Sequence, residues 1–304
     1  MKSLPTRARP ALPHVNYGSA GRDNGPMRIT SLGYLTDLAV RRAEGSEIAD
    51  LGDHVVVRSP GNPGYWWGNF LLLAEAPGPQ ELARWLKRFE AEFPAARHRT
   101  FGLDLTSVSH DAAAVFLAEG FQPERNVVLT ARSLDAVGAP RIPAVIRPLA
   151  GDDDWRQSAR LRRACAAADD QSEVHRPGRA GRAPEPDPQR EEFEQRKLAA
   201  RRRLTEAGMG AWLGAFADGR LVAQLGVVDA GCGLARYQDV ETHPGYRRRG
   251  LAGALVIRAA RTAVTDFGAA RLVMLADPGY HAIRLYRSLG FEPAEEQVGF
   301  LRPP

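Results

Sequence analysis

An arginine-rich turn that leads directly into a helix is the segment of the sequence with the clearest chemistry. Arg247, Arg248 and Arg249 precede Gly250, and an amphipathic run then extends to Phe267. The first N–H groups of a helix have no partner within the helix and carry a partial positive charge, so they attract anions. A glycine at that point lets a phosphate group approach the backbone closely. The sequence therefore predicts a diphosphate site at this helix start.

Strands and helices that alternate along the chain must position this turn. In the second half, the predicted strands are 144–149, 211–216, 221–229, 234–242 and 271–275, followed by a closing strand. The predicted helices of that half are 152–168, 189–207, 250–267 and 280–289. In the first half, the predicted strands are 54–59, 67–74, 100–105 and 126–130, with one helix at 79–93 and another that ends near residue 119. This alternation is typical of a mixed α/β architecture.

The two halves contain the same unit in the same order. Residues 111–124 and 281–294 both read as an amphipathic helix closed by Gly-Phe-x-Pro, and the two glycines are 170 residues apart. Upstream, Phe-Pro-Ala-Ala-Arg at 93–97 is similar to Phe-Gly-Ala-Ala-Arg at 267–271. Two matches in the same order indicate an internal repeat.

The arginine-rich turn resembles the cofactor motif of the GNAT acetyltransferase superfamily, Arg/Gln-x-x-Gly-x-Gly/Ala. Arg247, Gly250 and Ala252 match its specified positions, and the family's later Leu-Tyr-x-x-x-Gly-Phe is present at 285–291. The resemblance covers roughly residues 144–302. It implies an α/β (α+β) fold with two GNAT-like domains, each a central mixed, mostly antiparallel sheet flanked by helices. It also implies an acyltransferase that uses acetyl-CoA as co-substrate and needs no metal.

Position by position, the resemblance implies which groups hold acetyl-CoA. Backbone groups from Val240 to Thr242 would bind the pantetheine arm and the acetyl carbonyl, and the N–H groups from Arg248 to Gly253 would hold the pyrophosphate. The expected cofactor-binding residues are Val240, Thr242, Arg247, Arg248, Arg249, Gly250, Leu251, Ala252 and Gly253.

Acetyl transfer to an amine needs a group that removes a proton from the amine and a group that protonates the leaving thiolate. Tyr286 occupies the tyrosine position of the family motif and is the candidate acid, whereas the first copy has Phe116 at the equivalent place. Glu241 is the candidate base. A water molecule relayed by Gln238 or Tyr237 is the alternative.

The face on which Glu241 lies depends on the regularity of the strand at 234–242. Strict alternation puts Tyr237, Asp239 and Glu241 on one face, and Gln238 and Val240 on the other. A β-bulge would reverse this assignment. Either face can therefore look into the cleft.

Composition limits the classes of function. The 304 residues suffice for two domains, and a hydrophobic fraction of 44% with 25% charged residues is ordinary for a globular protein. The apolar runs are too short to cross a bilayer, so we expect a cytoplasmic protein without membrane partners. A net charge of +5 suits an anionic partner. No nucleic-acid motif accompanies the arginine clusters, so we expect no nucleic-acid partner.

The repeat divides the chain into expected segments. Residues 1–26 read as a flexible tail, 27–133 as a degenerate GNAT-like domain, 134–143 as a linker and 144–304 as the acetyltransferase domain. Within the last domain, proline-rich residues 175–188 read as a mobile loop, either a lid over the acceptor pocket or a solvated insertion.

The first copy lacks the features of a cofactor site. Its segment 74–80 has neither the arginines nor the glycine step, and Glu75 would repel a diphosphate. Its aromatic run at 65–67 is read as a core or inter-domain contact, with a ligand surface as the alternative.

The second half is therefore predicted to be an N-acetyltransferase that passes acetyl directly to the amine of a small molecule or peptide. The alternative is a non-catalytic acyl-CoA-binding module. The sequence leaves the acceptor and the oligomeric state open.

Overall fold

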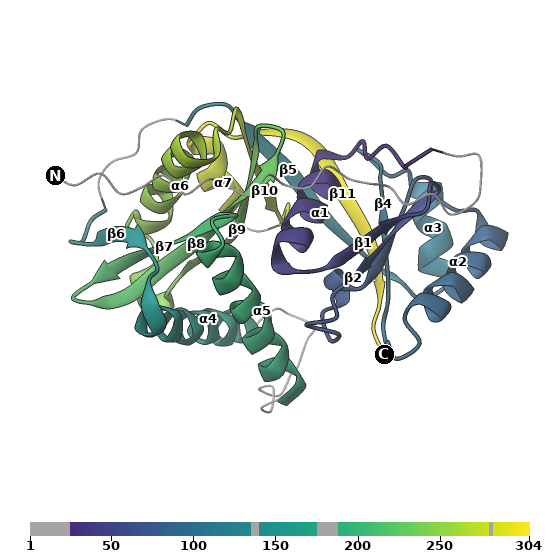
Figure 1. Cartoon of the computed structure of the whole chain (residues 1–304), viewed down its shortest axis with the longest axis horizontal. Helices are drawn as coiled ribbons and strands as arrows, with labels where there is room; N and C mark the ends of the chain where they lie inside the picture. The colour runs from purple at the N-terminus through teal and green to yellow at the C-terminus, as the bar shows by residue number, and fades with distance from the viewer. Residues whose placement is uncertain (1–24, 135–139, 175–187, 280–281) are drawn as a thin grey trace.

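The structure is a computed structural model that describes residues 25–134, 140–174, 188–279 and 282–304. The predicted tail at 1–26 and the loop at 175–188 fall largely outside these residues, as does half of the linker at 134–143. The described residues form one continuous eleven-stranded sheet with seven α-helices packed around it (Figure 1). No helix among them is long and apolar enough to cross a membrane.

The helices and strands have the following bounds. The helices are α1 Leu32–Glu44, α2 Pro79–Glu92, α3 His110–Ala118, α4 Gly151–Val174, α5 Pro188–Glu206, α6 Leu251–Phe267 and α7 Ala282–Ser288. The strands are β1 Glu47–Asp50, β2 His54–Arg58, β3 Phe70–Leu73, β4 Arg99–Leu103, β5 Gln122–Ala131, β6 Val145–Pro148, β7 Gly210–Ala217, β8 Arg220–Gly231, β9 Leu234–Thr242, β10 Arg271–Ala276 and β11 Glu292–Arg302. Two short 3₁₀ turns, η1 Trp66–Gly68 and η2 Pro244–Tyr246, complete the set.

The two halves share the sheet by exchanging their last strands. The strand order is β1-β2-β3-β4-β11-β5-β10-β9-β8-β7-β6. Strand β5, which ends the first copy, lies between β10 and β11, and β11, which ends the second, lies between β4 and β5. All of these pairings are antiparallel. In Figure 1 both long strands cross the middle of the molecule, so neither half has a complete sheet without the other.

The internal repeat is visible in the topology. Strands β3 and β4 pair in parallel, as do β9 and β10, and in each half a helix (α2 or α6) connects the two strands. A second helix, α3 or α7, then leads into the exchanged strand. The prediction of a mixed, mostly antiparallel α/β fold with flanking helices is confirmed, and the two units share one sheet instead of having one each.

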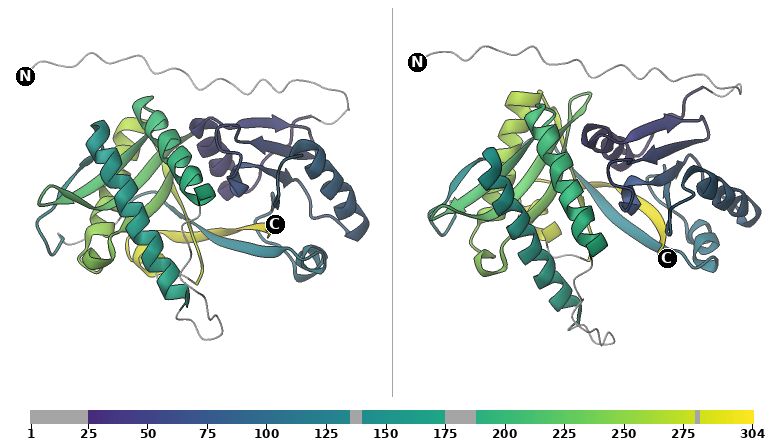
Figure 2. Two further views of the ribbon diagram at one scale, coloured as in Figure 1. Left: turned by 90° about the horizontal axis from the view of Figure 1, so that it is seen from below. Right: turned by 60° about the horizontal axis from the view of Figure 1, so that its bottom comes forward.

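Helices cover both faces of the sheet because strand residues alternate between two apolar cores. In β7, Leu213 and Ala215 belong to the core under α6, whereas Trp212 and Phe216 belong to the core under α4 and α5. Figures 1 and 2 show α4 and α5 side by side on one face, with α6 on the other.

Helix α1 and strand β1 are absent from the elements predicted from the sequence. The helix has clear end signals, since the Ser31 hydroxyl accepts from the Tyr34 N–H and Gly45 closes it in the left-handed conformation at φ 97°. Its buried face, however, includes Thr36, Asp37 and Arg41, so apolar periodicity is weak. Polar contacts with the second half replace apolar packing there.

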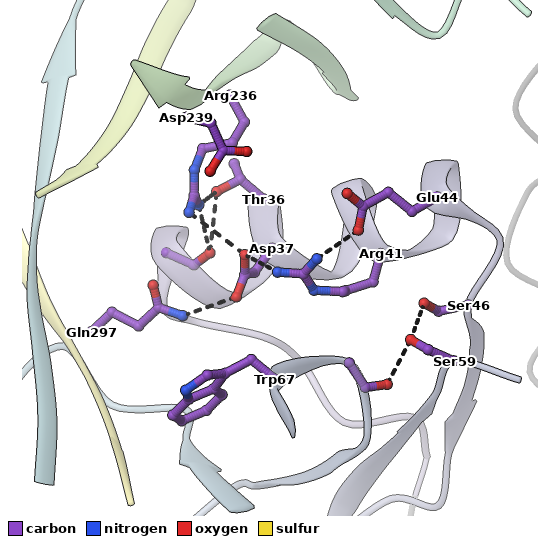
Figure 3. A network of polar contacts seen from close by, with 12 residues as sticks. Thr36, Asp37, Arg41, Glu44, Ser46, Ser59, Trp67, Arg236, Asp239 and Gln297 are labelled. Atoms are coloured by element: carbon purple, nitrogen blue, oxygen red, sulfur yellow. Dashed lines mark hydrogen bonds and ion pairs between the residues drawn. The ribbon is translucent and has the colours of Figure 1, made fainter. Parts of the chain in front are cut away.

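One such contact joins α1 to the centre of the sheet (Figure 3). Arg236 of β9 donates to the Thr36 hydroxyl at 2.8 Å and to the carbonyl oxygen of Gly33 at 3.3 Å. Gln297 of β11 donates to the Asp37 carboxylate at 3.3 Å. Buried polar groups with such partners fix the register of two elements against each other.

Candidate active site

Strands β9 and β10 separate beside the start of α6. They pair only between residues 234–236 and 271–273. Strand β9 then continues to Thr242 while it remains paired with β8 on its other side. In the described structure, the β10-facing edge of β9 has no strand partner after Arg236. Its backbone N–H and C=O groups are therefore available to an extended ligand.

A β-bulge interrupts β9 where the strands separate. The register of β9 with β8 shifts between Gln238 and Glu241, and Asp239 has a left-handed φ of 45°. The Tyr237 hydroxyl donates to the carbonyl oxygen of Val256 on α6 at 3.0 Å, whereas Glu241 contacts Arg162 on α4. The assignment of Tyr237 and Glu241 to one face is thus wrong, because the bulge turns the strand between them.

The predicted diphosphate turn lies at the carboxyl end of β9. Arg248 and Gly250 both have left-handed φ values, 61° and 82°, and Leu251 opens α6. The first N–H to donate within the helix is that of Ala254, to the carbonyl oxygen of Gly250 at 3.1 Å. The first turn contains no acidic residue. The helix start therefore offers N–H groups to an anion without a competing carboxylate of its own.

The three arginines of the turn have different surroundings. The Arg247 Nε donates to the carbonyl oxygen of Thr242 at 3.3 Å, which closes the turn against the end of β9. The Arg249 guanidinium lies 5.1 Å from the centre of the Tyr246 ring. The side chain of Arg248 is exposed. Arg248 is thus the arginine that extends furthest into solvent beside the helix start.

The remaining predicted cofactor residues lie around this turn. The side chain of Val240 packs against the α6-side core, and Thr242 ends β9 opposite Ala223 of β8. Leu251 and Gly253 are buried under the first turn of α6, and Ala252 is half-buried. The structure therefore brings all nine predicted cofactor residues to the junction of β9 and α6.

Glu241 is held by side chains from β8 and α4. Gln224 Nε2 donates to one oxygen of its carboxylate at 2.6 Å, and Arg162 donates to the other at 2.9 Å. The Gln224 carbonyl accepts in turn from the Ser158 hydroxyl at 2.6 Å, which fixes the orientation of the amide. Burial raises the pKa of Glu241, although Arg162 opposes the rise. A raised pKa suits a carboxylate that must accept and release a proton.

Asp239 beside it has the opposite character. Burial alone would raise the pKa of Asp239, but Arg201, Lys197 and Arg162 hold it well below its usual range. Arg201 contacts its carboxylate directly, and Arg162 lies 3.6 Å away. Both carboxylates are ion-paired, but of the two only Glu241 has a raised pKa.

Tyr286 lies on the other face of the sheet from Glu241. It is 7% exposed and belongs to the core that α6 forms with β9 and β10. Its ring centre is 6.4 Å from that of Phe291. The two candidate catalytic residues therefore approach the separated strands from opposite sides, with no direct contact between them among the described residues.

The supporting residues Arg162, Gln224 and Ser158 were missed in the sequence reading. One of them left a signal, since Gln224 is a polar residue in the otherwise apolar run 221–228 of β8 and is only 1% exposed. A buried amide in such a run must find polar partners. Ser158 and Arg162 sit in a helix rich in polar residues, where no pattern distinguishes them.

Comparisons with known proteins agree with this geometry. A sequence model of the acetyltransferase (GNAT) family matches residues 172–291. No curated protein matches the sequence. Among solved structures, a GCN5-related N-acetyltransferase from Kribbella flavida is similar at a TM-score of 0.60 and 19% identity, covering 90% of this chain and 97% of that one.

Two further structures are similar over most of their length. A GCN5-related N-acetyltransferase from Sphaerobacter thermophilus has a TM-score of 0.53 at 18% identity, covering 86% of this chain and 83% of that one. A tandem GNAT protein from the clavulanic acid biosynthesis pathway has a TM-score of 0.52 at 14% identity, covering 91% of this chain and 90% of that one. The second half of the chain therefore matches the acetyltransferase (GNAT) family model, and the chain as a whole has the fold of a tandem GNAT protein.

Proposed function

We propose that the protein is an acetyl-CoA-dependent N-acetyltransferase that passes the acetyl group directly from the thioester to a primary amine. The observation that carries this proposal is the helix start at Gly250, which has no acidic residue in its first turn and lies beside an unpaired edge of β9. The helix start suits a diphosphate, and the unpaired edge of β9 suits an extended arm.

The residues of β9 and α6 divide the binding of acetyl-CoA between them. The N–H groups from Arg248 to Gly253, with the guanidinium groups of Arg247, Arg248 and Arg249, hold the pyrophosphate. The backbone of Val240 and Thr242 pairs with the pantetheine arm in the manner of an added strand. The acetyl carbonyl then lies where β9 and β10 separate.

The chemistry needs one proton to leave the acceptor and one to reach the thiolate. Glu241 removes a proton from the acceptor amine, either directly or through water, as the amine nitrogen attacks the thioester carbon. When the C–S bond breaks, Tyr286 protonates the sulfur. The products are an amide and free coenzyme A, and no covalent intermediate with the protein is formed.

The position of Glu241 indicates the side from which the acceptor enters. Its carboxylate lies on the face covered by α4 and α5, whereas Tyr286 and α6 lie on the other face. The amine of a small molecule or peptide therefore approaches from the α4 and α5 side, and acetyl-CoA from the α6 side. The gap between β9 and β10 allows the amine to reach the thioester.

A free-thiol assay with acetyl-CoA and a panel of primary amines tests this function. The panel contains an aminoglycoside, a polyamine, amino acids and a lysine-containing peptide. The proposal expects saturable thiol release with at least one acceptor and a strongly reduced rate for Tyr286→Phe. Acetyl-CoA binding by calorimetry serves as the control, since this variant should bind normally.

The same experiment separates an enzyme from a non-catalytic acyl-CoA-binding module. A module would bind acetyl-CoA and release no thiol with any acceptor. Acetyl-transfer rates that are the same for the parent and for Tyr286→Phe would remove that residue from the mechanism.

A further inference from the structure

A second pocket lies at the junction of the two halves, apart from the turn at 247–253. Its volume is about 350 Å³, and it is lined by the end of α1, the loop at 59–65 and the α5 segment 196–207. This volume falls within the range of small-molecule pockets. None of its lining residues belongs to β9 or α6, so the proposed acetyl-CoA site does not account for it.

The pocket has an excess of positive charge. Four cationic side chains line it, Arg42, Arg196, Lys197 and Arg203, against the single carboxylate of Glu44. That carboxylate is already paired with Arg41 at 2.6 Å. The excess is therefore not neutralised within the pocket.

Three of the four cations, Arg42, Lys197 and Arg203, have no acidic partner within 4 Å among the described residues. Arg196 pairs with Glu192 at 2.5 Å, but Arg42 and Arg203 have no such contact and are exposed at the pocket. They come from different halves of the chain, one from α1 and the other from α5. Guanidinium groups that line one pocket can bind a carboxylate or phosphate through charge-assisted hydrogen bonds.

Lys197 lies deeper and is also without a hydrogen-bonded partner among the described side chains. Its ammonium is 4.9 Å from the centre of the Tyr65 ring, and the guanidinium of Arg41 is 4.5 Å from the same ring. Burial lowers the pKa of Lys197 to about 8, although Asp239 and Glu44 oppose this and Arg201 and Arg162 add to it. An anion in the pocket would compensate for this lost solvation.

Hydroxyl groups complete the lining. The Ser46 and Ser59 hydroxyls lie 2.7 Å apart at the end of α1 (Figure 3). Ser59 donates to the carbonyl oxygen of Gly68, so Ser46 is the donor of the pair. The apolar side chains of Leu204 and Met209 line the pocket as well. Both hydroxyl protons are thus engaged within the protein, and the cations together with the apolar groups are what fits a small organic acid.

We propose that this junction pocket is a binding site for a small organic anion with carboxylate or phosphate groups. Arg42 and Arg203 contact the anionic groups at the mouth, and Lys197 contacts them further in. Because both halves contribute, the bound anion stabilises their junction. Helix α5, which lines the pocket, also contacts the residues around the candidate base. Its Arg201 pairs with Asp239, and its Glu194 pairs with Arg162.

Calorimetric titration of the full chain with two probes, citrate and inorganic phosphate, tests the proposal at low ionic strength. The parent is expected to bind at least one of them, and the stronger probe identifies carboxylate or phosphate as the preferred group. The double variant Arg42→Gln/Arg203→Gln should lose about 10-fold or more in affinity, because it removes two charge-assisted contacts to the anion. Both side chains are exposed, so the fold should persist, as circular dichroism would verify.

Two controls separate this pocket from general charge effects and from the acetyl-CoA site. Arg258→Gln/Arg261→Gln removes two exposed charges from α6 and should bind the probe like the parent. Gly250→Glu should retain the probe binding that depends on Arg42 and Arg203, because it alters only the diphosphate turn.

Three results would overturn the proposal: no binding of either probe, equal affinity in the parent and the Arg42/Arg203 variant, or binding that is lost only in Gly250→Glu. Each of these leaves the proposed acetyltransferase activity unaffected.

Discussion

The two halves place a helix start at the same point of the fold, but only one start is open. In the first half, α2 begins with Pro79, which has no N–H, and the carboxylate of Glu81 accepts from the Gly78 N–H at 2.7 Å. In the second half, α6 begins after Gly250 with no acid in its first turn. The sequence pointed to Glu75 as the group that excludes a diphosphate, whereas in the structure Glu81 occupies the helix start.

The strand before each of these helices differs as well, because β3 is fully paired with β4 whereas β9 separates from β10. Strand β3 stays paired with β4 to its last residue, Leu73, whose carbonyl oxygen also accepts from the Asp104 N–H at 2.8 Å. Strand β9 leaves β10 after Arg236 and runs on to Thr242. A shared fold therefore does not by itself provide a cofactor site. The site requires both an open helix start and an unpaired strand edge.

The largest effect is expected from closing the open helix start. Gly250→Glu places a carboxylate and a strained φ at the proposed diphosphate site, so acetyl-CoA affinity should fall by at least about 100-fold, or about 2.7 kcal/mol. Gly268→Glu is the matched control, because Gly268 ends the same helix with a left-handed φ of 66° and has no neighbouring atoms within 4 Å of an added Cβ. Calorimetry should find near-parent affinity in the control. Similar affinities in both variants would place the cofactor elsewhere.

Removing the candidate base should affect turnover without affecting the helix start. Glu241→Gln keeps the shape of the side chain and removes its basicity, so kcat with a responsive acceptor should fall by about 100-fold or more. Acetyl-CoA affinity should stay within about twofold, a free-energy change smaller than the one kcal/mol that corresponds to about fivefold. Glu191→Gln, an exposed change on α5, is the control. A parent-like kcat for Glu241→Gln would favour the water relay instead.

The pH dependence of the reaction gives a smaller, directional test. Because burial raises the pKa of Glu241, activity should fall as the pH drops through a value above the usual glutamate range. Arg162→Met removes the cation that favours the charged carboxylate, so this acid limb should move to still higher pH. This acid limb is measured as kcat/KM from about pH 4, near the reference pKa of glutamate, up to about pH 8. A limb that stays in place in Arg162→Met would contradict the assignment of Glu241.

The smallest effect is expected from opening the closed helix start of the first half. Glu81→Ala removes the carboxylate that caps α2, which should cost about 0.5–2 kcal/mol of unfolding free energy. It should not create a second acetyl-CoA site, because Pro79 still lacks an N–H and β3 and β4 stay paired. Denaturant unfolding measures the first effect, and the stoichiometry of acetyl-CoA binding measures the second. Two sites per chain in this variant would show that the capping carboxylate alone closes the first half.

The sequence predicted those parts of the protein whose signals are local. The turn at Gly250 and the strand Leu234–Thr242 need only neighbouring residues to be recognised, and both appear as expected. The exchange of β5 and β11 carries no local signal, because an exchanged strand has the same alternation as an unexchanged one. Helix α1 was missed for a related reason, since its buried residues find polar partners in distant strands.

The catalytic side of the site was only partly predictable. The sequence offers Glu241 as the candidate base, but its face depends on a bulge at Asp239, a non-glycine residue in a left-handed conformation. Its partners on α4 and β8 are distant in sequence and were not identified. Tertiary contacts of this kind set the pKa of the carboxylate, so the sequence alone could not predict the environment of this candidate.

A crystal structure of the protein with coenzyme A tests the central claim most directly. The account predicts one molecule of coenzyme A per chain, with its diphosphate within hydrogen-bond distance of the N–H groups from Arg248 to Gly253 and its pantetheine arm along the free edge of β9. Coenzyme A at the start of α2, or away from both helix starts, would contradict it.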